Sequence, residues 1–219
     1  NVDLWEYSPF IFSTIVVILT LLSWYTVRES LQLRNQEYFE VLVSDTQDEL
    51  IDRYLLYERS LLGGLGLFYS SNAVERDEWK RYVSALDVGK NFPGNNGVGD
   101  IDYVRAEDLS SYLEQTRADG APDFVNHPDT PHSDKFIIKF IEPVEQNIQA
   151  VGLDIGFEAN RRAAAEGARD EGVPRLTQKI ELVQDAKKQP GFLLLIPVYD
   201  VGYTPPSVEE RRTHFQGWV

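Results

Sequence analysis

The densest group of residues that could do acid–base chemistry lies between positions 154 and 171. It comprises five carboxylates, Asp154, Glu158, Glu166, Asp170 and Glu171. Two such groups can act as general acid and base when a cleft shifts the pKa of one of them. Asp170 and Glu171, however, stand at the end of a predicted helix beside Gly172, and Glu166 falls on an exposed helical turn, so solvation accounts for them. We therefore predict no catalytic residue.

Other motifs for catalysis, metal binding or phosphate binding are weak. His127, Asp129 and His132 lie in the irregular segment 118–134, and a zinc site needs a more rigid support than a surface loop. The glycine-rich loop 91–104 lacks the lysine and the following helix of a phosphate-binding loop. The chain has no cysteine and no nucleophile or dinucleotide fingerprint. We predict no metal site and no cofactor, and we interpret His214 as structural.

Composition narrows the possible partners. The chain has 219 residues, 42% of them hydrophobic, which suffices for one large or two small domains. Its formal net charge of -14 argues against a nucleic-acid partner, because binding phosphates needs a basic surface. The chain contains no methionine, so the initiator is absent and we expect a processed or trimmed piece of a longer protein.

A membrane anchor is predicted at the N-terminus. Residues 10–27 are uncharged and, as a helix rising about 1.5 Å per residue, span about 27 Å, close to a bilayer core. Trp5 and Tyr7 precede them and Trp24 and Tyr25 close them, as in the aromatic belts of membrane helices. A cleaved signal peptide is disfavoured because a basic leading region and a cleavage motif are missing. The orientation in the membrane stays open.

A long amphipathic helix is predicted from Arg28 to about Tyr69. Its apolar residues recur at three-, four- or near-seven-residue spacing: Leu31, Tyr38, Leu42, Leu50, Tyr54, Tyr57, Leu61, Leu65 and Phe68. At roughly 60 Å it exceeds a small domain, so we predict a parallel homodimer stalk. The alternative is that the stripe packs only on its own domain. Gly63, Gly64 and Gly66 indicate either close packing or a bend.

Residues 135–199 are predicted to fold as strand, helix, strand and strand. The run 136–143 ends at Pro143, and an Ala-rich helix ends at Gly172. Residues 175–184 alternate as a strand, and the continuous apolar run 191–200 is predicted to be a strand buried on both faces. Upstream, we expect a helix at 76–86 capped by Ser71 or Asn72, a strand at 98–104 and a helix at 107–117. The fold class is α/β (α+β) with a mixed sheet.

Seven motifs in a fixed order resemble a CHASE domain over roughly residues 55–219. They are PG..G.GDIDYV (93–104), P..N...GLDIG (143–156), RRAAAEGARDEG (161–172), RLT (175–177), GFLLLIPVYD (191–200), ERR (210–212) and the terminal GWV. The resemblance implies an extracellular or periplasmic sensory module of transmembrane histidine kinases, diguanylate cyclases or adenylate cyclases, related to plant cytokinin receptors. It also implies two PAS-like subdomains after the long helix and a last strand that normally continues past GWV.

The resemblance places five residues around a ligand cavity: Ile155, Arg161, Thr177, Val183 and Leu195. In cytokinin receptors the position matching Arg161 is an aspartate, so an arginine reverses the charge there. A guanidinium favours carboxylate, phosphate or carbonyl ligands, and we expect an anionic small molecule rather than a cytokinin. The alternative for Arg161 is a surface salt bridge to Glu158 or Glu166. Thr177, Val183 and Leu195 are equally compatible with an ordinary core.

The sequence therefore predicts a ligand-sensing ectodomain without enzymatic activity in this segment. We expect a transmembrane anchor (1–27), a stalk helix (28–70) and a sensory domain (71–219), located outside the cytoplasm at the plasma or inner membrane. Ligand binding would shift the dimeric stalk and regulate a cytoplasmic kinase or cyclase. Two alternatives remain: a protein-binding scaffold, and a membrane-anchored hydrolase that would need an open cleft at Asp154 and Glu158.

Overall fold

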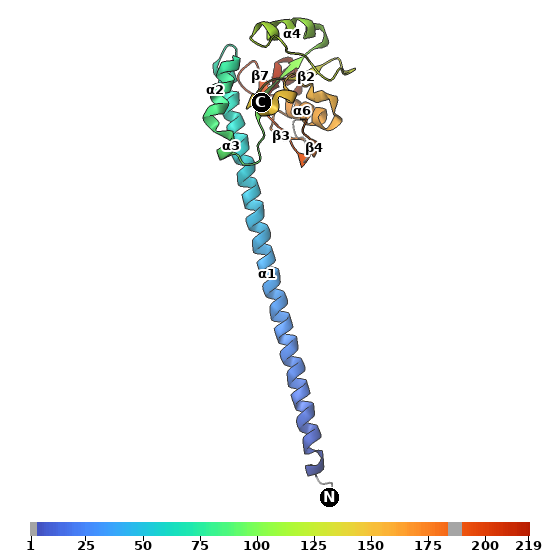
Figure 1. Cartoon of the computed structure of the whole chain (residues 1–219). Coiled ribbons are helices and arrows are strands. Elements are labelled where there is room, and N and C mark those ends of the chain that lie inside the picture. Colours follow the sequence, from blue (N-terminus) through green and yellow to red (C-terminus); the bar gives the residue numbers. More distant parts are fainter. Residues whose placement is uncertain (1–3, 184–189) are drawn as a thin grey trace. The chain divides into compact units, whose positions relative to one another are not determined.

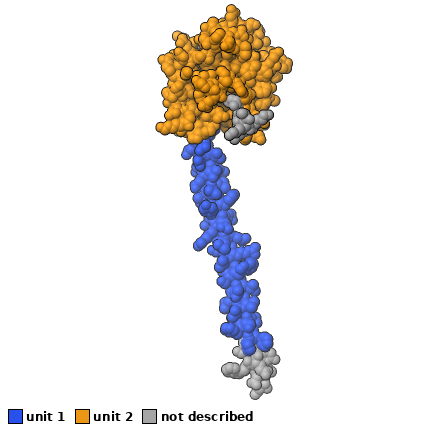
Figure 2. Space-filling view, in the orientation of Figure 1, with its two compact units in different colours: residues 1–54 blue, residues 55–219 orange. Residues whose placement is uncertain are grey.

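The computed structural model describes residues 4–183 and 190–219 (Figure 1). It divides into two compact units, Asn1–Tyr54 and Leu55–Val219 (Figure 2). The first helix, α1 (Leu4–Ser70), supplies the first unit and the beginning of the second.

The first unit is an exposed helix with an apolar N-terminal half. Within the described residues, α1 is the one helix long and apolar enough to cross a membrane. Two hydroxyl groups of its apolar part are satisfied inside the helix, since Thr14 Oγ1 and Thr20 Oγ1 each donate to a carbonyl four residues earlier at 2.8 Å. Such internal pairing is what a lipid environment demands. The helix thus has the properties of the predicted membrane anchor.

The predicted stalk stripe divides between the two units. Leu31, Tyr38, Leu42 and Leu50 are all more than half exposed. Further along α1, Tyr57, Leu61, Leu65 and Phe68 belong instead to a hydrophobic cluster with α2 (Arg76–Leu86) and the sheet. The alternative that the whole stripe packs on its own domain therefore holds only for the end of the helix.

The centre of the second unit is a four-stranded sheet in the order β2-β1-β8-β7. Its strands are β1 (Val98–Val104), β2 (Lys135–Glu142), β7 (Pro197–Tyr199) and β8 (Phe215–Trp218). All three pairings are antiparallel, so the prediction of a mixed sheet is wrong for this sheet. The predicted strands at 98–104 and 136–143 are confirmed. A register shift between Asp100 and Ile101 interrupts the β1–β2 ladder.

Two short ribbons replace the two long strands predicted at 175–184 and 191–200. Strand β3 (Arg175–Leu176) pairs with β6 (Leu194–Leu195), and β4 (Ile180–Glu181) pairs with β5 (Pro190–Gly191). Prolines lack the amide hydrogen that a ladder needs, and Pro197 falls within the second run. Burial on both faces is also wrong at its start, where Phe192 is 59% exposed. Residue 184 of the first run lies outside the described residues.

Short helices and 3-10 turns complete the unit. They are α3 (Val88–Asn91), η1 (Ala106–Asp108), α4 (Leu109–Ala118), α5 (Val144–Asn147), η2 (Ile148–Ala150), η3 (Ile155–Phe157), α6 (Ala159–Glu171) and α7 (Val208–Thr213). The predicted end of α6 at Gly172 is confirmed, with φ of 70° at the glycine. The predicted cap of α2 is wrong: Glu75 caps it, and its amide donates to the Glu78 carboxylate at 3.1 Å.

The two faces of the sheet are covered differently. Helix α6 covers one face, where Ala165 and Ala168 pack on Phe136, Tyr199 and Trp218. On the other face, the end of α1 and α2 cover one part of the sheet and α4 covers another. Gly64 of α1 lies against the Trp79 and Tyr82 rings of α2, where an added Cβ would crowd both rings. Close packing, rather than a bend, accounts for this glycine.

Candidate functional site

Three of the five predicted ligand residues belong to one apolar cluster under α6. Ile155 of η3 and Leu195 of β6 are fully buried, and Val183 is half-buried against the same cluster. Arg161 and Thr177 are also buried, with 2% and 4% of their surface exposed. The structure therefore brings these residues to the side of the sheet that α6 covers, although they are far apart in the sequence.

Arg161 lies in the first turn of α6 and is held on several sides. Its Nε donates to Glu158 at 2.9 Å, its Nη2 donates to the Glu181 carbonyl at 2.6 Å, and its guanidinium lies 5.2 Å from the Phe157 ring centre. Burial lowers the pKa of Arg161, and Glu158 partly offsets this. The expected salt bridge to Glu158 exists, but the side chain is buried rather than on the surface. Arg161 therefore makes the predicted salt bridge to Glu158 from a buried position.

Thr177 fixes the ribbon beside Arg161. Its amide donates to the Leu193 carbonyl at 2.9 Å, and its Oγ1 accepts from the Leu193 amide at 3.0 Å. In the segment between β3 and β4, the Thr177 hydroxyl oxygen therefore accepts the hydrogen bond that a backbone carbonyl would accept in a regular ladder. This contact positions Leu193 and the neighbouring Leu195 under α6.

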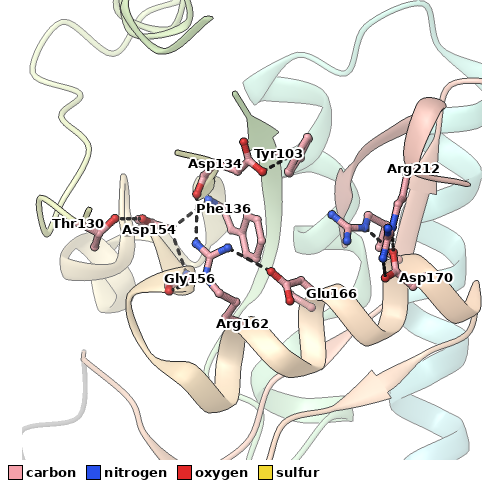
Figure 3. Close-up of polar contacts among 12 residues, drawn as sticks. Tyr103, Thr130, Asp134, Phe136, Asp154, Gly156, Arg162, Glu166, Asp170 and Arg212 are labelled. Carbon is pink, nitrogen blue, oxygen red and sulfur yellow. Dashed lines mark hydrogen bonds and ion pairs between the residues drawn. The ribbon is translucent and has the colours of Figure 1, made fainter. Parts of the chain in front are cut away.

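Asp154 organises a buried polar network next to the same cluster (Figure 3). Its Oδ1 accepts from the amides of Phe136 and Gly156 at 3.0 Å each, and its Oδ2 accepts from Thr130 Oγ1 at 2.9 Å. Lys135 Nζ lies 4.0 Å from Oδ2. Asp154 is fully buried and all its partners are structural, so it meets no substrate and the open cleft that a hydrolase needs is missing at this residue.

Arg162, which the sequence did not single out, joins α6 to this network. Its guanidinium lies 4.3 Å from the Phe136 ring centre and donates to the carbonyls of Gly156 and Asp134 at 3.1 Å each. It also reaches Glu166 at 3.3 Å, as Figure 3 shows. The two adjacent arginines thus contact different elements. Arg162 bonds the Asp134 carbonyl before β2, whereas Arg161 bonds the Glu181 carbonyl of β4.

Asp170 links the other end of α6 to α7. Arg212 donates to both of its carboxylate oxygens, and Arg169 Nε donates to Oδ1 at 2.7 Å (Figure 3). Arg211 Nε adds a bond to the Asp170 carbonyl at 2.8 Å. Hydrogen bonds from Arg212 and Arg169 hold the pKa of Asp170 far below its ordinary value. The charged form is therefore the stabilising one.

Replacing Asp170 by asparagine is expected to lower the free energy of unfolding by about 1–2 kcal/mol at pH 7. Because the folded pKa is depressed, the stability from this group is complete above the unfolded pKa of about 3.9 and is lost as the pH falls through the folded pKa. The difference between wild type and Asp170→Asn should thus shrink in acid. Urea unfolding from pH 7 to pH 2 measures it, with exposed Asp123→Asn as control. A difference that does not change with pH would contradict this assignment.

A large cavity lies on the sheet face opposite α6. It has a volume of about 920 Å³, and its wall residues come from the end of α1, from α4 and from four strands. None of the five predicted residues lines it. The sequence carried one signal for it, because Asp100 and Asp102 alternate in β1 with Ile101 and Tyr103, which face the α6 cluster. Two carboxylates on one side of a central strand are unusual.

Comparison with protein families gives one match. The model of the CHASE domain family matches residues 72–219, which covers the sheet, α6 and both ribbons. The search of curated proteins found no match to the chain. The resemblance inferred from the seven motifs is thus confirmed.

Proposed function

The chain belongs to the CHASE domain family, and from this we propose that it senses a small anionic ligand for a transmembrane receptor. CHASE domains are non-catalytic sensory domains located outside the cytoplasm. The apolar part of α1 is suited to anchor the domain in a membrane. We assign anchor, stalk and sensory roles to residues 1–27, 28–70 and 71–219, with the plasma or inner membrane as the location.

The observation that carries the ligand proposal is the environment of Arg161. Only 2% of the side chain is exposed, and its guanidinium pairs with Glu158, whose side chain is 32% exposed. Its Nε and Nη2 are engaged, whereas Nη1 has no hydrogen bond to any residue that the structure describes. A buried guanidinium with an available donor favours a carboxylate or phosphate. In this proposal Ile155, Thr177, Val183 and Leu195 form the remaining walls of the pocket.

The pocket is proposed to act through the ribbons and α6. A ligand on Arg161 would compete with the Glu181 carbonyl for the guanidinium and so favour one position of the β4–β5 ribbon. The response would pass to α1 through the sheet, since Trp79 of α2 donates to the Val98 carbonyl of β1 at 3.3 Å. The exposed apolar residues of the first unit support a second copy of the chain as partner of the stalk. A two-state stalk could then regulate a kinase or cyclase.

Native mass spectrometry of the whole chain in detergent tests this function. We expect a bound small acid on the wild type, and we expect Arg161→Gln to bind it at least about 10-fold more weakly, because a charge-assisted hydrogen bond is lost. Arg175→Gln is the matched control, since Arg175 pairs with Glu171 at the exposed end of α6. Equal occupancy in Arg161→Gln and wild type would exclude Arg161 as the anion-binding residue.

A scaffold that binds another protein is the second candidate. It would be favoured if the wild type carried no small molecule and the walls around Arg161 closed on one another. The buried position of Leu195 and Ile155 is compatible with such a filled core. The family membership nevertheless favours ligand sensing.

A further inference from the structure

The cavity opposite α6 has a polar floor and aromatic walls. Its floor contains Asp100 and Asp102 of β1 and Lys139 of β2. Aromatic residues of α1 and α4 line it, namely Phe68, Tyr69 and Tyr112, and so do three residues of β1, β7 and β8 that also belong to the α6 cluster, Tyr103, Tyr199 and Phe215. Its volume of about 920 Å³ suits an organic molecule, since ligand pockets usually span about 300–1,000 Å³.

The wall of the cavity contains more acidic than basic side chains. The wall contains four carboxylates, Asp100, Asp102, Asp108 and Asp200, against two basic side chains, Arg105 and Lys139. Lys139 Nζ lies 3.8 Å from Asp102, and His214 Nδ1 lies 2.8 Å from Asp200. Arg76 packs on the Phe140 ring nearby but does not line the cavity. The floor therefore holds two carboxylates and one ammonium group.

Asp100 and Tyr112 are two buried polar groups at the cavity. Only 3% of the surface of Asp100 is exposed, and no described side chain donates a hydrogen bond to its carboxyl group. The Tyr112 hydroxyl oxygen is buried, and burial together with the neighbouring Asp102 raises the pKa of Tyr112. Burial and the neighbouring Asp102 raise the pKa of Asp100 well above its ordinary value, although Lys139 opposes this. A backbone hydrogen bond from Ile101 and the charge of Lys139 do not offset the burial of this carboxyl group, so a cationic ligand would stabilise its charged form.

We propose that this cavity is a second ligand site, for an organic primary amine with an aromatic or apolar body. The ammonium group binds Asp100, and the body lies among the aromatic rings of α1 and α4. A metal ion fits less well, because no three acidic or histidine side chains in the described ranges are grouped to hold one, and Lys139 already occupies the floor. The site shares no residue with the Arg161 pocket, so it stands or falls independently of the proposed function.

The position of the site favours a regulatory role. Phe68 and Tyr69 are the last turn of α1, and Ser71 to Val74 continue the wall directly after it. Tyr199 connects the opposite wall to α6, because its hydroxyl donates to the Arg169 carbonyl at 2.7 Å. An amine bound here would contact both the helix that continues toward the apolar segment and the strand next to α6.

Calorimetric titration of the whole chain in detergent with 2-phenylethylamine tests the site. We expect binding of the amine at pH 7.5, and binding at least 10-fold weaker for 2-phenylethanol, which has the same body without the charge. Asp100→Asn should weaken amine binding by about 10- to 100-fold, because a charge-assisted hydrogen bond is removed. Binding should also weaken as the pH falls, since protons neutralise Asp100 while the amine, with a pKa near that of lysine at about 10, stays charged.

Two further variants make the result decisive. Gln115→Trp, at the exposed rim, should block the cavity without changing the buried acid. Asp123→Asn, an exposed aspartate outside the cavity, should bind the amine as the wild type does. The proposal is wrong if the alcohol binds as tightly as the amine, or if a folded Asp100→Asn chain and the Gln115→Trp chain both keep the wild-type affinity.

Discussion

Replacing Asp154 by alanine is expected to lower the free energy of unfolding by about 3–5 kcal/mol, because it leaves a buried charge and two buried amides without their partner. Asp154 is fully buried, and Lys135 beside it is 5% exposed. Lys135 Nζ would keep only Thr130, to which it donates at 2.6 Å. Urea unfolding of the whole chain, followed by tryptophan fluorescence, measures the loss.

Asp154→Asn separates the charge from the hydrogen bonds. The asparagine carbonyl can still accept from the amides of Phe136 and Gly156, so we expect a smaller loss of about 1–3 kcal/mol. Asp123→Ala is the exposed control and should change stability by less than about 0.5 kcal/mol. If Asp154→Ala were as stable as Asp123→Ala, the buried network would have no structural role. The interpretation of Asp154 as a structural rather than a catalytic residue would then lose its support.

The second large effect is expected at Trp218. This residue is fully buried, and its ring centre lies 4.7 Å from the ring centre of Phe136 and 4.6 Å from that of Phe215. Its Nε1 donates to the Ala165 carbonyl of α6 at 2.9 Å. Trp218→Ala should cost about 3–5 kcal/mol, because it leaves a large cavity between the sheet and α6. Thermal and urea unfolding both measure this change.

Trp218→Phe keeps an aromatic ring in that space and removes the hydrogen bond. We expect a cost of about 1–2 kcal/mol, well below that of alanine. Equal costs for the two variants would mean that the hydrogen bond to Ala165, rather than packing, joins α6 to the sheet. Because α6 carries Arg161, either loss should also weaken anion binding in the proposed pocket.

The elements with strong local signals were predictable from the sequence. The long helix, α2, β1, β2 and α6 all have clear periodicity or a clear end, such as Gly172 with its positive φ after α6. The ribbons were not predictable, because residues 191–199 read as one apolar run. Hydrogen bonding by Thr177 and the missing amide of Pro197 interrupt that run in three dimensions.

The two candidate sites, like the fold, could be predicted only in part from the sequence. The family resemblance predicted Arg161, Ile155, Thr177, Val183 and Leu195 around one ligand cavity, but only the structure shows that Arg161 is buried and bonded to the Glu181 carbonyl. The partner of Arg161 lies 20 residues away on a ribbon that periodicity did not resolve. The opposite cavity depends on α1, α4 and the sheet meeting around Asp100, which no local pattern encodes.

The central claim is that an occupied pocket changes the stalk, and a distance measurement across the stalk tests it most directly. The chain has no cysteine, so Asp48→Cys in the exposed part of α1 provides one spin label per copy. We predict two copies whose label-to-label distance distribution shifts when the bound acid is dialysed away, and an Arg161→Gln chain that shows the ligand-free distribution throughout. A distribution that is the same with ligand, without ligand and in Arg161→Gln would contradict the account.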